Sequence, residues 1–294
     1  MGRLTTDKLL TFLDAQLGVW PMAAGNFAAL GGVECRDVVV DGRMPVRLQH
    51  NPARIMSTAA RTDKASVSAR PCFLCGRNRP VQQTGLHAEG GYTVLVNPFP
   101  IFDAHFTIPA DEHVPQLIVA DGFRRLRDMW QLAADLYGMA VFYNGPRCGA
   151  SAPDHFHFQV VGRDALPLLG MVDGRAPMLC PYRVESELFH TADGAVAWFA
   201  DLCRQLAELP ENAGEEEPRM NIICHADGAG VRVTVIPRRA HRPDFYGSGE
   251  NEVLVSPASV DLAGVMVVPS PDDFHRKLTP EVVSAILHQT CYYK

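Results

Sequence analysis

Hydrophobic residues recur at two spacings along the chain of 294 residues, and the two spacings predict a mixture of helices and strands. Apolar residues at steps of three and four predict helices, most clearly over residues 120–138. Short runs of β-branched and aromatic residues predict strands. The predicted helices cover residues 4–19, 120–138, 195–208 and 279–291, and the predicted strands cover residues 37–40, 45–49, 54–59, 92–96, 105–108, 140–143, 155–161, 220–224, 231–236 and 265–268.

The order of these elements indicates the fold class and the domain organisation. Helices and strands do not alternate regularly, so we expect an α+β fold with a mainly antiparallel sheet and long packed helices. The polar run Glu-Asn-Ala-Gly-Glu-Glu-Glu-Pro at residues 211–218 is the clearest internal boundary. We therefore expect two halves, residues 1–210 and residues 211–294, each with a sheet and a long helix.

Composition and charge limit the partners that the protein can bind and the compartment in which we expect it. The net charge of −6 argues against nucleic-acid binding, which needs a basic surface. No apolar run reaches the length of about 18 residues expected of a membrane-spanning helix. No charged and then apolar leader opens the sequence, so we expect a cytoplasmic protein. The eight cysteines are scattered, which favours reduced thiols over a disulfide framework.

Polar and aromatic residues alternate in the stretch His-Phe-His-Phe-Gln at residues 155–159. Side chains on a strand alternate between two faces, so we expect His155, His157 and Gln159 on one face. An imidazole can attack phosphorus and leave again, which suits the transfer of a nucleotidyl group. The Gln159 amide can bind a phosphoryl oxygen but offers no base for water, which favours transfer over hydrolysis. Histidines in a buried strand are the alternative interpretation.

The segment before this stretch carries groups that suit phosphate binding. Asn144 supplies an amide and Arg147 supplies a cation. Ser151 adds a hydroxyl, and Gly149 permits close approach of the backbone. Basic residues in other predicted turns suit a second phosphate, with a solvated turn as the alternative interpretation. The further candidates for contacts with the ligand are His105, Arg54 and Arg239.

Cys72 and Cys75 form a C-x-x-C pair, a spacing at which two thiolates can bind one metal ion. A tetrahedral zinc site needs two more ligands, and the sequence has no second C-x-x-C pair. The candidates for these ligands are His105, His113 and His155. A site completed by the last two would connect separate segments and hold the histidine-bearing strand rigid. Buried thiols and a redox-active pair are the alternatives.

These motifs together resemble the galactose-1-phosphate uridylyltransferase branch of the histidine triad (HIT) superfamily. That branch has a glycine–small–serine loop followed by H-x-H-x-Q, as at residues 149–151 and 155–159. It also has a Cys-Phe-Leu-Cys knuckle, as at residues 72–75, and a histidine after a strand and a proline, as at residues 109–113. The order and the spacing agree over about residues 45–165.

Two differences make the chain more similar to other members of the superfamily. Phe156 stands where the uridylyltransferases usually have proline, and one more residue separates Ser151 from His155. The pattern G-A-S followed by H-x-H-F-Q is closer to the GDP-hexose phosphorylases. Dinucleoside-tetraphosphate phosphorylases share the H-x-H-x-Q core. The resemblance therefore leaves the base, the sugar and the acceptor open.

The resemblance implies a HIT-like fold with a catalytic first half and a smaller second half that completes the substrate site. It implies a nucleotidyltransferase or phosphorylase that acts on a nucleotide sugar or a dinucleoside polyphosphate. His157 would carry the nucleotidyl group, and phosphate or a sugar phosphate would accept it. A HIT-type hydrolase and a zinc-stabilised nucleotide-binding protein are the alternatives, and a homodimer is compatible with the sequence. The implied ligands of a structural zinc ion are Cys72, Cys75, His113 and His155.

Overall fold

The structure is a computed structural model that describes residues 3–55, 64–228 and 230–293. The strand predicted at residues 54–59 lies outside these ranges from residue 56 onward, and Arg54 itself ends the 3-10 helix Pro52–Arg54. The helices are α1 (Thr6–Val19), α2 (Pro21–Ala28), α4 (Lys64–Ser68), α5 (Ala120–Asp135), α6 (Pro167–Val172), α7 (Ala192–Ala207), α8 (Ser259–Leu262) and α9 (Pro280–Thr290). The strands are β1 (Glu34–Val40), β2 (Met44–His50), β3 (Leu86–Ala88), β4 (Tyr92–Val96), β5 (His105–Pro109), β6 (Met139–Asn144), β7 (His157–Gly162), β8 (Glu185–Phe189), β9 (Met220–Asp227), β10 (Gly230–Pro237) and β11 (Val265–Val268).

The strands form two sheets. The larger sheet has eight strands in the order β3-β4-β5-β7-β6-β9-β10-β8, and every neighbouring pair is antiparallel. The smaller sheet has the order β1-β2-β11, in which β11 runs parallel to β2. The prediction of an α+β fold with a mainly antiparallel sheet is therefore confirmed.

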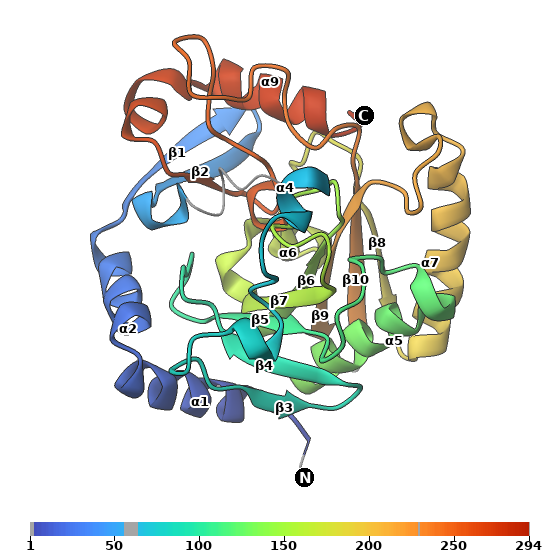
Figure 1. The fold of residues 1–294 in the computed structure, drawn as a ribbon. Helices are drawn as coiled ribbons and strands as arrows, with labels where there is room; N and C mark the ends of the chain where they lie inside the picture. Colours follow the sequence, from blue (N-terminus) through green and yellow to red (C-terminus); the bar gives the residue numbers. More distant parts are fainter. Residues whose placement is uncertain (1–2, 56–63, 229, 294) are drawn as a thin grey trace.

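Different layers cover the two faces of the larger sheet (Figure 1). Helices α1, α5 and α7 pack on one face, in a core that includes Phe156 and Phe158. The smaller sheet and helices α6, α8 and α9 pack on the other face, in a core that includes Phe142. In the described part of the chain, no helix combines the length and the apolar character needed to cross a membrane.

The strand that carries the histidine motif starts later than the sequence predicts. Strand β7 begins at His157, where it pairs with Pro109 of β5. His155 lies in a turn, because its backbone N–H donates to the carbonyl of Ala152 at 3.2 Å. The prediction that His155 shares a strand face with His157 and Gln159 is therefore wrong. The turn points His155 to a separate cluster of side chains.

The expected boundary near residue 210 falls between two strands of the same sheet. Residues 210–212 form a short 3-10 helix between α7 and β9. Strand β9 then pairs with β6, from Ala140 opposite His225 to Asn144 opposite Asn221. Both parts of the chain thus contribute to one sheet, and the division into two HIT-like halves remains a prediction.

Candidate functional site

A cavity of about 590 Å³ lies over strands β4 to β7 of the larger sheet. This volume falls in the range of about 300–1,000 Å³ that is typical of small-molecule sites. Residues from the far ends of the chain also line it, including Trp20 and Val267. The structure brings six of the proposed site residues into this lining, namely Arg54, Asn144, Gly149, Ser151, His157 and Gln159.

The orientation of the His157 ring leaves one nitrogen available in the cavity. Its Nδ1 lies 2.9 Å from the carbonyl oxygen of His155. A carbonyl can only accept a hydrogen bond, so Nδ1–H donates and Nε2 of the neutral ring keeps its lone pair. Burial lowers the pKa of His157 to about 4, so the ring is neutral at pH 7. The arrangement thus supplies a neutral imidazole nitrogen at the cavity wall.

Gln116 holds the backbone of this histidine, a role that no sequence motif indicated. The Gln116 side chain is fully buried, and its Oε1 accepts the backbone N–H of His157 at 2.7 Å. Its Nε2 donates to the carbonyls of Asn144 and His157, both at 3.0 Å. One amide therefore connects the end of β6 to the start of β7.

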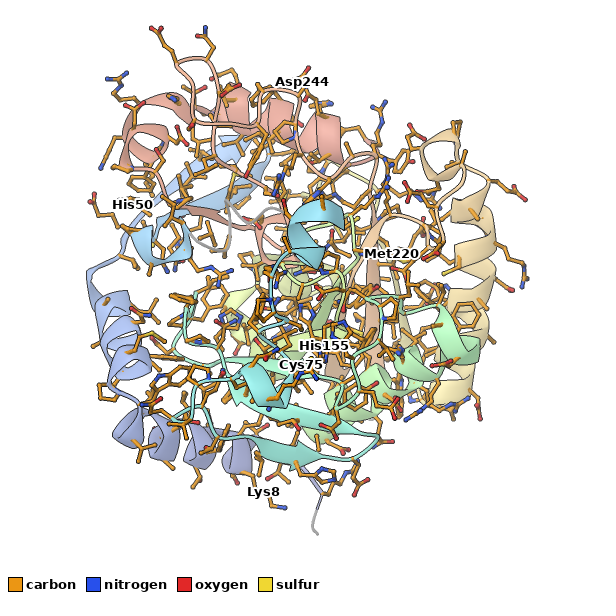
Figure 2. The ribbon with its side chains drawn as sticks, viewed as in Figure 1. Lys8, His50, Cys75, His155, Met220 and Asp244 are labelled. Atoms are coloured by element: carbon orange, nitrogen blue, oxygen red, sulfur yellow. The ribbon has the colours of Figure 1, made fainter. Side chains whose placement is uncertain are left out.

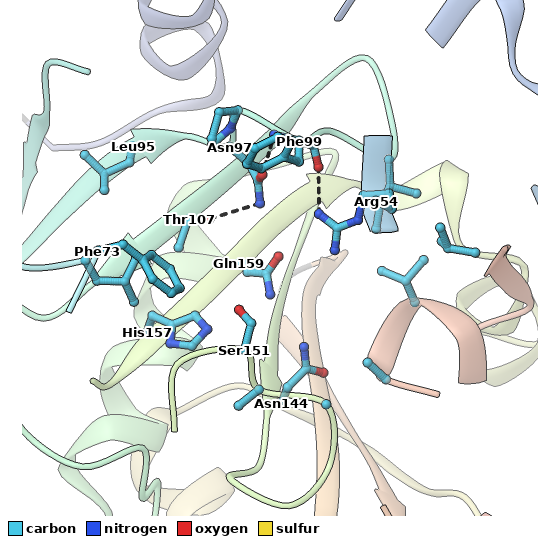
Figure 3. Close-up of a pocket in the computed structure, with 18 of the residues that line it drawn as sticks. Arg54, Phe73, Leu95, Asn97, Phe99, Thr107, Asn144, Ser151, His157 and Gln159 are labelled. Carbon is cyan, nitrogen blue, oxygen red and sulfur yellow. Dashed lines mark hydrogen bonds between the residues drawn. The ribbon is translucent and has the colours of Figure 1, made fainter. Parts of the chain in front are cut away.

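Gln159 lies two residues after His157 on the same face of β7, and His105 holds its side-chain oxygen. The backbone N–H of Ile101 donates to His105 Nδ1 at 3.2 Å, so in the neutral ring the proton is on Nε2. That Nε2–H donates to Gln159 Oε1 at 2.9 Å. The amide nitrogen of Gln159 is then left for the cavity, which matches its orientation in Figure 3.

The loop after β6 passes close to the C-terminal part of the chain at Gly149. This glycine has a φ of +97°, which non-glycine residues rarely adopt. A Cβ atom at this position would lie 2.5 Å from the Cβ of Ala258. Glycine therefore allows the loop that carries Ser151 to pack against the segment leading into α8.

Arg54 places a positive charge in the cavity lining. Its guanidinium donates to the carbonyl of Phe99 at 2.7 Å, while its Nε has no hydrogen-bond partner among the described residues. Burial lowers the pKa of Arg54 to about 10, so the group stays charged at pH 7. Among the described lining residues, Asp261 supplies the only carboxylate. Its oxygens accept the backbone N–H groups of Ala258 and Val267, at 2.8 and 2.9 Å.

The cavity has an apolar side and a polar side. Figure 3 shows Phe73 and Leu95 on one side of Gln159, and Arg54 on the other. Sequence analysis missed most of this lining, because its residues come from segments that carry no common motif. The apolar residues that line the cavity include Trp20, Met22, Phe73, Leu74, Pro80 and Leu95, and the missed polar ones include Arg70, Asn97 and Ser256. The basic turn after β10, which the sequence indicated for a second phosphate, contributes His241 and Arg242 to the lining.

Three proposed ligand-binding residues lie outside the lining. His105 is fully buried behind Gln159. Burial, and to a smaller extent the charge of Arg54, lowers the pKa of His105 to about 3. Arg147 pairs with Glu215 at 2.8 Å, and Arg239 lies 3.4 Å from Glu211. The guanidinium groups of Arg147 and Arg239 thus face carboxylates, and their binding to phosphate remains a prediction.

Cys72, Cys75, His113 and His155 form a cluster that could hold a metal ion, with ligand atoms within 4.8 Å of one another. His155 Nδ1 lies 3.2 Å from Cys72 Sγ and 3.6 Å from Cys75 Sγ. His113 Nδ1 lies 3.3 Å from both Cys75 Sγ and His155 Nδ1. Metal–ligand bonds of about 2.0–2.3 Å in a tetrahedron give edges of about 3.3–3.8 Å, which these distances approach. The four residues therefore fit a tetrahedral ion.

One histidine of this cluster is oriented for metal binding by its other ring nitrogen. His155 Nε2 donates to the carbonyl of Ala110 at 2.8 Å, which leaves the lone pair on Nδ1, facing the cysteines. His113 Nε2 lies 3.9 Å from a carboxylate oxygen of Asp154. Figure 2 shows Cys75 and His155 next to each other, near the centre of the view. The cluster connects the knuckle, the segment after β5 and the entrance to β7.

Comparisons with known proteins agree with this fold. The fold is shared with solved structures of an Ap4A phosphorylase, so the predicted fold is confirmed. The chain belongs to the family described as Domain of unknown function (DUF4922), whose family model matches residues 12–162. No curated protein matches the sequence.

Similar solved structures include those of the yeast Ap4A phosphorylase Apa2. The crystal structure of that enzyme has a TM-score of 0.60 and 15% identity, covering 94% of this chain and 97% of that chain. Its complex with AMP has a TM-score of 0.59 and 15% identity, covering 94% and 96%. Its complex with Ap4A has a TM-score of 0.62 and 14% identity, covering 94% and 98%. At this identity the likeness shows the fold alone.

Proposed function

We propose that this protein is a nucleotidyltransferase of the phosphorylase kind, which acts through a nucleotidyl group carried on His157. Its substrate is a dinucleoside polyphosphate or a nucleoside diphosphate-sugar. The choice of dinucleoside polyphosphate is supported by the shared fold with a phosphorylase whose structures include AMP and Ap4A complexes. The nucleotide-sugar alternative is supported by the motif pattern at residues 149–159.

One observation carries the proposal: the ring of His157 is held by Nδ1 while Nε2 stays free at the cavity wall. The Nδ1–H donates to His155 O at 2.9 Å, so the ring cannot rotate without losing this bond. A nucleophile needs an unprotonated nitrogen with a fixed direction, and burial keeps the ring neutral. A histidine with only a packing role would not need an unprotonated nitrogen at a cavity.

The chemistry consists of two in-line displacements at the α-phosphorus. In the first, the Nε2 lone pair of His157 forms a bond to phosphorus, and the bond from phosphorus to the bridging oxygen breaks. The oxygen leaves with the electron pair, on a nucleotide or a sugar phosphate. In the second, an oxygen of inorganic phosphate bonds to the phosphorus, and the P–N bond breaks to restore the Nε2 lone pair. The products are a nucleoside diphosphate and the free enzyme.

The polar lining favours transfer to phosphate over transfer to water. Gln159 and Asn144 are uncharged amides, which stabilise phosphoryl oxygens without acting as bases. The carboxylate of Asp261 is occupied by two backbone N–H groups and serves as a structural acceptor. The charge of Arg54 suits an anionic leaving group or acceptor. The apolar side of the cavity then receives the nucleoside.

We infer that the metal of the Cys72, Cys75, His113 and His155 cluster is structural zinc. Two thiolates and two imidazoles are a typical zinc ligand set, and all four positions of the tetrahedron are filled by protein. When bound, the ion would join the knuckle to the entrance of β7. His155 and His157 thereby have separate tasks, one in holding the strand and one in the reaction.

Intact-mass measurement after incubation with dinucleoside polyphosphates and nucleotide sugars tests this function. We expect the wild-type protein to gain the mass of one nucleoside monophosphate, and the added mass identifies the base. His157→Ala should gain none, while it keeps its metal and its fold. The experiment is repeated with inorganic phosphate, which should discharge the adduct as nucleoside diphosphate.

Three outcomes would contradict the proposal. Equal turnover by the wild type and by His157→Ala would exclude this histidine as the nucleophile. Release of nucleoside monophosphate at the same rate with and without phosphate would make the protein a hydrolase. Binding of nucleotides without any adduct or turnover would make it a binding protein.

A further inference from the structure

The side-chain oxygen of Asn144 is fully occupied by groups from the C-terminal part of the chain. Asn144 Oδ1 accepts the side-chain N–H of Asn221 at 2.8 Å. It also accepts the backbone N–H of Ser259 at 3.0 Å and the hydroxyl of Ser259 at 2.7 Å. A backbone N–H can only donate, so the atom that faces Ser259 must be the oxygen. The assignment of the Asn144 amide therefore does not depend on the choice of rotamer.

Asn221 is fixed in the same way by a buried arginine. Arg238 is fully buried, and its guanidinium donates to Asn221 Oδ1 at 2.7 Å. Its other donors go to the backbone carbonyls of residues 240, 241, 257 and 290. A guanidinium has no acceptor atom, so the Asn221 oxygen must face it. The Asn221 nitrogen is then left to donate to Asn144, and to Cys148 O at 2.8 Å.

From this chain of bonds we propose that Asn221 and Ser259 are positioning residues, which hold the Asn144 amide with its N–H groups directed into the cavity. Asn144 then binds an anionic phosphoryl oxygen as a donor. Asn144 lines the cavity, and Figure 3 shows its nitrogen on the side of Ser151 and Gln159. This assigns a role in anion binding to residues of β9 and α8 that do not themselves touch the ligand.

The arrangement leaves the two amides of this cavity wall able to act toward a ligand only as donors. The oxygen of Gln159 is bound by His105, and the oxygen of Asn144 is bound by Asn221 and Ser259. Both nitrogens are left for the ligand. An amide that is free to rotate can present either its donor nitrogen or its acceptor oxygen, and the oxygen would repel a phosphate. Fixed amides avoid this cost, because the donors are oriented before the anion arrives.

The test is the isosteric change Asn221→Asp, which replaces the donating nitrogen by an oxygen. The carboxylate can still accept from Arg238, but it cannot donate to Asn144 Oδ1. The matched control is Asn212→Asp, because Asn212 is also buried, donates to Leu206 O at 2.8 Å and accepts the backbone N–H of Arg219 at 2.9 Å. Asn212 is not in the cavity lining. Each full-length variant is titrated with nucleoside monophosphates, with the matching nucleosides and with inorganic phosphate.

We expect Asn221→Asp to bind the preferred monophosphate and inorganic phosphate about tenfold more weakly or worse, the loss expected for a hydrogen bond to a charged group. Its affinity for the uncharged nucleoside should stay within about twofold, because no apolar contact changes. Asn212→Asp should bind all three probes as the wild type does. Ser259→Ala removes one donor and keeps the backbone N–H, so it should show a smaller loss in the same direction.

Several results would overturn this proposal. One is that Asn221→Asp binds monophosphate as tightly as the wild type does. Another is that Asn221→Asp loses affinity for nucleoside and for monophosphate equally. If Asn221→Asp does not fold, Ser259→Ala decides by the same comparison. The proposal rests on the proposed function only for the identity of the ligand. If the wild type turns over substrate and Asn221→Asp binds the probes equally well, only the positioning role is contradicted. If the wild type binds none of the probes, both the positioning role and the proposed function are contradicted.

Discussion

His105 Nε2 donates to Gln159 Oε1 at 2.9 Å, from a position fully buried behind the cavity wall. Burial first, and then the charge of Arg54, lowers the pKa of His105 to about 3, so the ring is neutral at pH 7. The backbone N–H of Ile101 faces Nδ1, so the single proton of the ring is on Nε2. The sequence suggested that His105 contacts the ligand, whereas the structure makes it the partner of a residue that lines the cavity.

This relationship predicts that His105→Leu lowers kcat by about tenfold or more, because Gln159 loses the donor that fixes its oxygen. His105→Gln keeps an N–H donor at a similar reach and should recover part of the loss. Steady-state kinetics on both variants measure the effect, and the metal content shows whether the cysteine–histidine cluster stays intact. Equal kinetics of the Leu and Gln variants would show that the donor is not what matters.

The cysteine–histidine cluster predicts that Cys72→Ser lowers both metal content and stability. The wild type should contain about one zinc ion per chain, and removing a ligand weakens both binding and folding because the two are coupled. Cys203→Ser is the matched control, since Cys203 is buried in the helix-covered core. Elemental analysis and thermal unfolding should show metal loss in Cys72→Ser alone. Full metal content in Cys72→Ser would exclude the assigned ligand set.

Gly149→Ala should reduce turnover more strongly than the control Gly174→Ala does. The new methyl group would lie 2.5 Å from Ala258 Cβ, so the loop that carries Ser151 must move away from the segment that leads into α8. Gly174→Ala is the control, because Gly174 also has a positive φ, +72°, but its Cβ would have no neighbour within 4 Å. Both variants carry backbone strain, and only the first carries the clash. Similar kinetics for the two variants would show that close packing of the loop is not required.

Asp173 should contribute stability that acid removes. Burial acts to raise its pKa, but hydrogen bonds from Arg163 and Arg175 and the charge of His225 outweigh it and lower the pKa to about 2, from 3.8. The unfolded chain therefore takes up the proton first as the pH falls. The contribution is fully present above about pH 4 and is lost as the pH falls through about 2.

Asp173→Asn tests this carboxylate at neutral pH. The change leaves the largely buried guanidinium of Arg163 without its carboxylate partner, which typically costs about 3 kcal/mol or more in the free energy of unfolding. The control Asp37→Asn removes an exposed pair with Arg47 and should cost about 0–1 kcal/mol. Urea unfolding at pH 7, 4 and 2 measures both. A difference between wild type and Asp173→Asn that does not shrink between pH 4 and pH 2 would contradict the assignment.

Local patterns in the sequence were sufficient for most of the secondary structure. The helices α1, α5, α7 and α9 and the hairpin β1–β2 follow from apolar spacing and from the Asp41-Gly42 turn signal, because neighbouring residues determine them. The sequence did not predict α2, α4, α6, α8, β3 and β8, which are short or lack a strong pattern. Strand β8, for example, is held by its pairing with the distant strand β10. The strand predicted at residues 155–161 begins two residues later than predicted, because a backbone turn at residues 152–155 replaces strand pairing there.

The sequence by itself determined which chemistry is available: a C-x-x-C pair, two histidines and a glutamine beside a glycine loop. Only the tertiary structure decided how these groups are used. It put His113 and His155 with the cysteines, and left His105 behind Gln159. It also directed Arg147 to Glu215 and brought apolar residues from the N-terminus to the cavity. Short-range spacing specifies reactive groups, whereas strand order and the packing of distant segments specify which groups meet.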